Sequence, residues 1–191
     1  MANIFRTDVD PDALLHLLQN ILDSLSDELK VVIGLSGGSL IHEFCGIFEK
    51  INFDWARAVF IFADERKVPF NDEESTFGQY QKHFVSKFPD RINSDQFLII
   101  DPSLNVEDCA SNYEWLLKKC DAIKISDDGF PIIDLLLLGI GPDGHTCSLF
   151  PDHIALKEVL SGVSSLPAAQ VNPKNGRVCW VLDAGSATLI S

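Results

Sequence analysis

Residues 132–146 read IIDLLLLGIGPDGHT, an apolar run that ends in a glycine-rich turn. The apolar half, broken only by Asp134, predicts a buried strand. The turn after it carries an aspartate and a histidine two positions apart, Asp143 and His145. A buried strand that ends in such a turn is how an α/β protein presents acid and base groups to a ligand. This stretch therefore predicts an α/β fold with a site at the carboxyl end of a strand.

Two other segments share this layout. The apolar runs Val31–Leu35 and Ala58–Phe62 each lead into a polar turn. The polar-turn residues after these runs are Ser36, Gly37, Gly38, Ser39, Asp64, Glu65 and Arg66. Because parallel strands end at the same edge of a sheet, we expect the three turns to point their polar groups the same way.

Helical patterns alternate with these strands. Apolar residues and element order predict helices over 10–29, 39–49, 73–88 and 106–120, and a short strand over 97–100. The first helix is expected to have Asp10 as its N-cap and Pro11 in its first turn. This order predicts one domain over residues 1–191, with a parallel, doubly wound, Rossmann-like sheet flanked by helices.

Composition excludes several classes of partner. The formal net charge of -13 argues against nucleic acid and anionic membranes, because both require basic surfaces. No apolar run is long enough for a membrane span, and the N-terminus lacks the pattern of a secretory signal. The five cysteines show no Cys-x-x-Cys spacing, which favours reduced thiols in the cytoplasm over disulfides or zinc. We expect no metal and no cofactor.

The first two polar turns each have two interpretations. Backbone N–H groups and the helix dipole around Gly37 and Gly38 favour an anion such as phosphate, although the Gly-x-Gly-x-x-Gly pattern and the Walker lysine are missing. Alternatively, the two glycines serve only to form a tight turn. After the second run, Asp64 could orient a base or hold a sugar hydroxyl while Arg66 binds an anionic oxygen. Alternatively, this segment is a salt-bridged strand end.

His145 is the best candidate for a general base, because an imidazole titrates near neutral pH. The alternative is a helix cap or a packed side chain. Cys147 is expected to pack, since residues two apart on a helix point away from each other and the thiol should not meet His145. A metal site is conceivable in residue type, but no ligand spacing supports it; its ligands would be Asp64, Asp143, His145 and His153.

Three segments carry a family resemblance: GLSGGS at 34–39, DERKVP at 64–69 with ESTFG at 74–78, and GIGPDGHTCSLFP at 139–151. As a set they resemble the 6-phosphogluconolactonase family and, more distantly, the glucosamine-6-phosphate deaminase/isomerase group. The Ser-Leu-Phe-Pro ending favours the lactonases. The deaminases resemble Asn-Glu-Pro there, and that glutamate has no counterpart in this chain.

The resemblance implies a metal-free hydrolase of 6-phospho-D-glucono-1,5-lactone in which His145 activates a water molecule. Asp143 and Asp64 would position His145 and the sugar, and a backbone N–H of the glycine loop would stabilise the oxyanion. The residues that the resemblance implies in substrate binding are Ser36, Gly37, Gly38, Ser39, Arg66, Gly141 and Gly144.

The chain departs from this family after the Ser-Leu-Phe-Pro ending. Family members continue through an Arg-led strand, a further strand and a Gly-x-x-Lys turn that opens a helix, and this sequence has none of them. It passes through a seam at about 160–167 into a segment that resembles the family's C-terminal tail. We therefore expect an internal deletion that leaves the sheet incomplete, weakens the phosphate grip and exposes a sheet edge to association. The full-length form is expected to be a monomer.

Two other functions stay open. A catalytically impaired form would bind a sugar phosphate, or modulate a partner, without turnover. A deaminase or isomerase of an amino-sugar phosphate is weaker, because its extra acid is missing.

Overall fold

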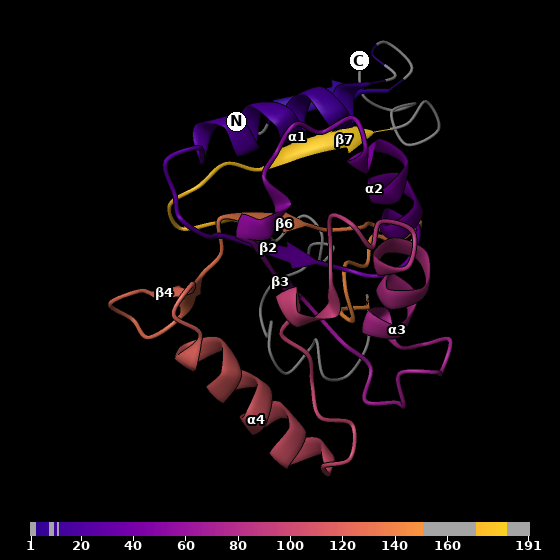
Figure 1. Ribbon diagram of the computed structural model, residues 1–191, viewed down its shortest axis with the longest axis vertical. Helices are drawn as coiled ribbons and strands as arrows, with labels where there is room; N and C mark the ends of the chain where they lie inside the picture. Colours follow the sequence, from indigo (N-terminus) through magenta and orange to yellow (C-terminus); the bar gives the residue numbers. More distant parts are fainter. Residues whose placement is uncertain (1–2, 8–9, 11, 151–170, 183–191) are drawn as a thin grey trace.

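The strands that carry the three predicted turns form one parallel sheet (Figure 1). The computed structural model describes residues 3–7, 10, 12–150 and 171–182. β2 (Val31–Leu35) is the central strand, with β3 (Ala58–Phe62) on one side and β6 (Leu135–Leu137) on the other. The last residues of the three strands are in register. All three strands therefore end at the same edge, which confirms the predicted parallel sheet.

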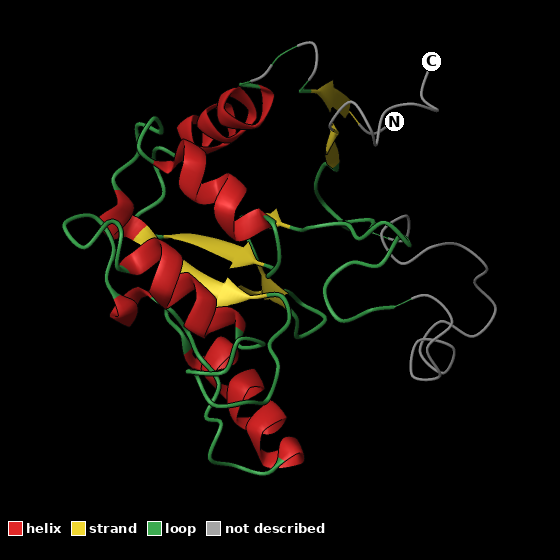
Figure 2. Ribbon diagram, turned by 90° about the vertical axis from the view of Figure 1, so that its right-hand side faces the viewer, coloured by secondary structure: helices red, strands yellow, loops and turns green. Residues whose placement is uncertain are grey.

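Helices cover both faces of this sheet, as Figure 2 shows. They are α1 (Ala13–Ser24), α2 (Leu40–Phe48), α3 (Thr76–Tyr80), its π-helical continuation (Gln81–Val85) and α4 (Val106–Lys119). The larger core lies between one face and α1, α2 and α3, and it buries Phe44, Phe48 and Phe84 completely. On the other face Val32 packs near Leu117 of α4. No helix in the described part of the chain is long and apolar enough to cross a membrane.

Two small pairs of strands lie beside the main sheet. β1 (Asn3–Arg6) pairs in parallel with β7 (Cys179–Leu182), and β4 (Lys124–Ile125) forms an antiparallel hairpin with β5 (Pro131–Ile132). Among the described residues no strand joins β6 to the β1–β7 pair. The seam predicted at 160–167 belongs to the segment 151–170, which lies outside the described residues.

The first helix is shorter than the sequence pattern predicts. It begins at Ala13 with Asp12 as its N-cap, while the Asp10 carboxylate accepts the Asp12 N–H at 3.1 Å ahead of the helix. It ends at Ser24, where a hydrogen-bonded turn replaces the next helical turn, and Leu29 beyond it is 89% exposed. An N-cap at Asp10 and a helix that reaches Leu29 are therefore wrong predictions.

The helices predicted over 39–49 and 106–120 are confirmed to within one residue at each end. Two other segments differ from their predictions. The third helix starts at Thr76 instead of residue 73, because turns precede it and the Ser75 hydroxyl caps it by accepting the Gly78 N–H at 3.0 Å. The segment 97–100 is not a strand, since it makes a single bridge, Phe97 to Phe60.

Asp134 explains why the apolar run 132–138 divides between two strands. Its carboxylate accepts the Val32 N–H at 2.8 Å, and its own N–H donates to the Val32 carbonyl at 3.1 Å. The side chain thus takes the place that a backbone carbonyl would hold in the ladder. Regular pairing with β2 consequently begins after Asp134, with β6.

Candidate active site

Ser36 ties the turn after β2 into the interior. Its side chain is buried, and its hydroxyl oxygen accepts the Gly139 N–H at 2.9 Å. Its carbonyl accepts the Tyr80 hydroxyl at 3.0 Å, and burial raises the pKa of Tyr80 far above its ordinary value, so this donor keeps its proton. Ser36 therefore joins the ends of β2 and β6 to the end of α3. Its contact with a ligand stays a prediction.

The next three residues bring backbone N–H groups to the start of α2. Gly38 has a φ of 72°, which residues with side chains rarely adopt. A Cβ on Gly37 would lie 3.3 Å from Thr76 Oγ1, so the turn lies against the start of α3. Among the described residues, no acceptor forms a hydrogen bond with the N–H of Gly38 or Ser39. Together with the helix dipole, these groups suit an anion.

Glycines shape the loop that carries His145. The Gly141 N–H donates to the His145 carbonyl at 2.9 Å, and the Gly144 N–H donates to the Gly141 carbonyl at 2.9 Å. Both N–H groups are therefore engaged within the loop. Gly144 has a φ of 84°, and a Cβ on Gly141 would fall 2.0 Å from Cε1 of His145. The imidazole lies against the Gly141 backbone, in space that a side chain at 141 would occupy.

Asp143 holds His145 through two contacts. Its Nδ1 lies 2.5 Å from Asp143 Oδ1, and its backbone N–H donates to the same oxygen at 3.2 Å. The ring contact first, and then the backbone N–H, hold the pKa of Asp143 below its usual range. Because an ionised carboxylate can only accept, Nδ1 carries the proton and Nε2 keeps a lone pair. No hydrogen-bond partner of Nε2 lies in the described part of the chain.

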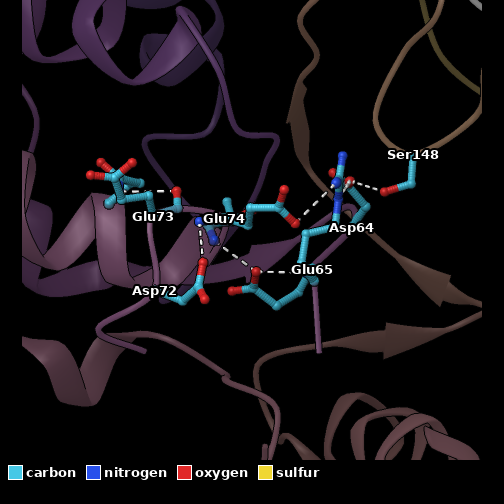
Figure 3. Close-up of polar contacts among 9 residues, drawn as sticks. Asp64, Glu65, Asp72, Glu73, Glu74 and Ser148 are labelled. Atoms are coloured by element: carbon cyan, nitrogen blue, oxygen red, sulfur yellow. Dashed lines mark hydrogen bonds and ion pairs between the residues drawn. The ribbon is translucent and has the colours of Figure 1, made fainter. Parts of the chain in front are cut away.

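Asp64 and Arg66 follow β3, on the other side of the central strand. The Asp64 carboxylate is 17% exposed and accepts the Ser148 hydroxyl at 2.5 Å (Figure 3). Arg66 Nε lies 4.0 Å from Asp64, and its Nη1 lies 4.0 Å from Glu74. The Arg66 side chain is 41% exposed, so two carboxylates hold its guanidinium loosely.

Comparison with known proteins assigns the chain to a family. Residues 7–182 match the family described as Glucosamine-6-phosphate isomerases/6-phosphogluconolactonase. The chain belongs to this family. The 6-phosphogluconolactonase of Rattus norvegicus is 35% identical over an alignment of 215 positions. The alignment covers 85% of this chain and 81% of the rat protein. A probable 6-phosphogluconolactonase of Drosophila melanogaster is 39% identical over 149 residues, which cover 75% of this chain and 57% of that protein.

Solved structures share the fold of this family member. The devB protein superposes with a TM-score of 0.75 at 23% identity, and the match covers the whole of both chains. The 6-phosphogluconolactonase of Trypanosoma brucei gives a TM-score of 0.74 at 18% identity, covering 100% of this chain and 99% of that chain. At these identities the likeness shows the fold alone, and it agrees with the predicted α/β class.

The candidate site is assembled in two groups of contacts. Asp143, His145 and Gly141 form the first, and Asp64 with Ser148 forms the second. In the described residues no hydrogen bond joins Asp64 to His145, so the predicted role of Asp64 in positioning the imidazole is not a direct contact. The described residues also contain no group of three or more His, Cys, Asp or Glu side chains arranged to hold a metal ion.

Glu65 is a residue to which the sequence gives no role of its own. Its Oε1 accepts the N–H groups of Arg66 at 2.8 Å and Thr76 at 2.7 Å, and its Oε2 accepts the N–H of Phe77 at 2.7 Å. Glu65 therefore caps the start of α3 and fixes the backbone of Arg66. Eleven residues separate Glu65 from Thr76, so no local sequence pattern predicts this cap.

Cys147 corrects one argument from the sequence. Its backbone has a φ of 54°, in the left-handed region, so the assumption that it follows His145 on a helix is wrong. Burial, and then the charge of Asp64, raise the pKa of the Cys147 thiol to about 11.

Proposed function

We propose that this chain hydrolyses 6-phospho-D-glucono-1,5-lactone to 6-phospho-D-gluconate in the oxidative branch of the pentose phosphate pathway. The observation that carries this proposal is the imidazole of His145, which Asp143 holds at Nδ1 and whose Nε2 has no hydrogen-bond partner among the described residues. Relatives named as 6-phosphogluconolactonases support the choice of substrate. The five free cysteines suit a location in the reducing cytoplasm.

The geometry supports a general-base mechanism. Nε2 of His145 takes a proton from water as the water oxygen attacks the lactone carbonyl carbon. The ionised carboxylate of Asp143 stabilises the resulting imidazolium through Nδ1–H. When the tetrahedral intermediate collapses, the bond from that carbon to the ring oxygen breaks, and the imidazolium returns its proton to this oxygen. General-base catalysis of this kind contributes about 10²- to 10⁴-fold to the rate.

Substrate binding requires local positive charge, because the net charge of -13 repels a sugar phosphate at long range. Arg66 and the N–H groups at the start of α2 supply it in this proposal. The N–H groups of Gly141 and Gly144 are engaged within their own loop. The N–H groups of Gly38 and Ser39 are therefore better placed to bind the phosphate or the developing oxyanion.

We also propose that the chain lacks an internal segment of its family. The alignment with the rat protein runs over 215 positions, more than the 191 residues of this chain, so gaps must open in this chain. The missing segment would include the Arg-led strand and the Gly-x-x-Lys turn, whose basic side chains are expected to bind the phosphate in other family members. Each lost charge-assisted hydrogen bond, worth about 1.5 to 3 kcal/mol, would weaken substrate binding about tenfold to hundredfold.

The gaps also favour a second candidate function, a sugar-phosphate binder without turnover. Calorimetric titration with 6-phosphogluconate and a turnover assay on the lactone, run on one preparation, separate the two functions. Turnover supports the hydrolase, and binding without turnover supports the binder. The absence of both turnover and binding would overturn both functions. Release of ammonia from glucosamine 6-phosphate would instead identify an amino-sugar deaminase.

A further inference from the structure

One hydrogen bond joins the segments that follow β3 and β6, the strands on either side of β2. Asp64 follows β3 and Ser148 lies in the loop after β6, and these strands flank β2. The Ser148 hydroxyl donates to the Asp64 carboxylate across a sequence separation of 84 residues. The bond therefore ties the loop of His145 to the far side of the sheet, as Figure 3 shows for the two partners.

Backbone and side-chain hydrogen bonds hold the turn that carries Ser148. The Leu149 N–H donates to the Thr146 carbonyl at 3.0 Å, which closes a turn with Cys147 and Ser148 at its centre. Cys147 has a φ of 54°, a conformation that persists where surrounding contacts hold it. Thr146 is buried and its hydroxyl donates to the Gly139 carbonyl at 2.9 Å, which anchors the start of the turn.

The same turn leads directly to the side chain that packs on the imidazole. Phe150 follows two residues after Ser148, and its ring centroid lies 4.4 Å from that of His145. Asp143 holds one edge of the imidazole, Gly141 leaves room for it, and Phe150 packs on it. Any change that releases Ser148 therefore acts on Phe150, and through it on the orientation of His145.

We infer that Ser148 is a positioning residue and that Asp64 and Ser148 form a latch that holds the loop 139–150, which carries His145, over the strand ends. In this latch Asp64 acts through the loop. Cys147 lies next to Ser148 in the same turn, so the accessibility of its thiol reports on whether the turn is held in place. The catalytic consequence rests on the proposed function, whereas the latch itself does not.

The catalytic part of the inference is tested with Ser148→Ala. Its kcat for lactone hydrolysis should fall about tenfold to hundredfold with little change in KM, because the imidazole loses its alignment while the binding groups stay in place. Ser148→Thr keeps the hydroxyl and should restore most of the rate. The matched control is Ser103→Ala, which removes a serine–aspartate hydrogen bond of 2.6 Å on a remote exposed loop. An unchanged kcat in Ser148→Ala would overturn the positioning role.

The latch is tested independently of turnover by the alkylation rate of Cys147. Iodoacetamide labelling at pH 8, followed by peptide mass spectrometry, should show Cys147 reacting severalfold faster in Ser148→Ala than in wild type or Ser103→Ala, because the released turn exposes the thiol. Cys120, measured in the same digests, should not change. Faster labelling supports the latch even if the wild type proves inactive, in which case only the proposed function and the catalytic consequence fail. Unchanged labelling in Ser148→Ala would overturn the latch.

Discussion

Substitution of Gly141 by alanine should disable the site without unfolding the protein. A Cβ at this position would lie 2.0 Å from Cε1, 2.1 Å from Nδ1 and 2.8 Å from Nε2 of His145. Normal contact between such atoms is about 3.5 Å, so the ring must retreat by about 1.5 Å. The imidazole ends a side chain that is 29% exposed, so it can move outward at little cost in stability.

The displacement should appear in the chemical step. A misplacement of about 1 Å costs about 10²-fold in rate, or about 2.7 kcal/mol in the activation barrier. We therefore expect kcat for lactone hydrolysis to fall about a hundredfold in Gly141→Ala, after correction for spontaneous ring opening. The urea unfolding midpoint should stay close to that of wild type.

Gly139→Ala is the matched control, because it adds the same methyl group to the same loop. Its Cβ would lie 3.7 Å from Ser36 Oγ, an ordinary contact. This variant should retain most of the wild-type kcat. Equal kcat values for wild type and Gly141→Ala would refute the reasoning, since a displaced imidazole could not then be the general base.

Three further predictions concern stability. Glu65→Gln weakens an acceptor of three backbone N–H groups and should lower the free energy of unfolding in urea by about 1 to 2 kcal/mol, whereas Glu74→Gln, an exposed carboxylate, should change it little. Ser36→Ala leaves the Gly139 N–H without its partner and should cost about 1 to 3 kcal/mol; unchanged stability with a raised KM would instead assign the hydroxyl to the ligand. Burial raises the pKa of Tyr113 to about 12, so its neutral form stabilises the fold fully below about pH 10 and this contribution is lost as the pH rises toward 12. Tyr113→Phe should therefore lose less stability than wild type over that interval, and equal losses would contradict the assignment.

The sequence predicts the centre of this fold because its signals there are local. The apolar runs of β2, β3 and β6 end in polar turns, and parallel pairing places these turns together. The contact between Asp143 and His145 is also local, since two residues apart in a turn can reach each other. Both the sheet and this pair therefore follow from short stretches of sequence.

Contacts between distant segments could not be predicted in this way. The Ser148 hydroxyl meets Asp64 across 84 positions, and Glu65 caps a helix that starts eleven residues later. The left-handed backbone conformation occurs at Cys147 and not at a glycine, so the sequence carries no signal for it and a helix was predicted instead. Leu29 matched the helical spacing, but the helix ended before it because a local turn intervened.

The most direct test of the central claim is the rate of hydrolysis of freshly generated 6-phosphogluconolactone by the wild-type chain and by His145→Ala. Product formation is followed by a coupled assay and corrected for spontaneous opening, with folding of both proteins checked by urea unfolding. The account predicts turnover by the wild type and a loss of about a hundredfold or more in His145→Ala. Equal rates in the two folded proteins, or no turnover by either, would contradict the claim that His145 is the general base of a lactone hydrolase.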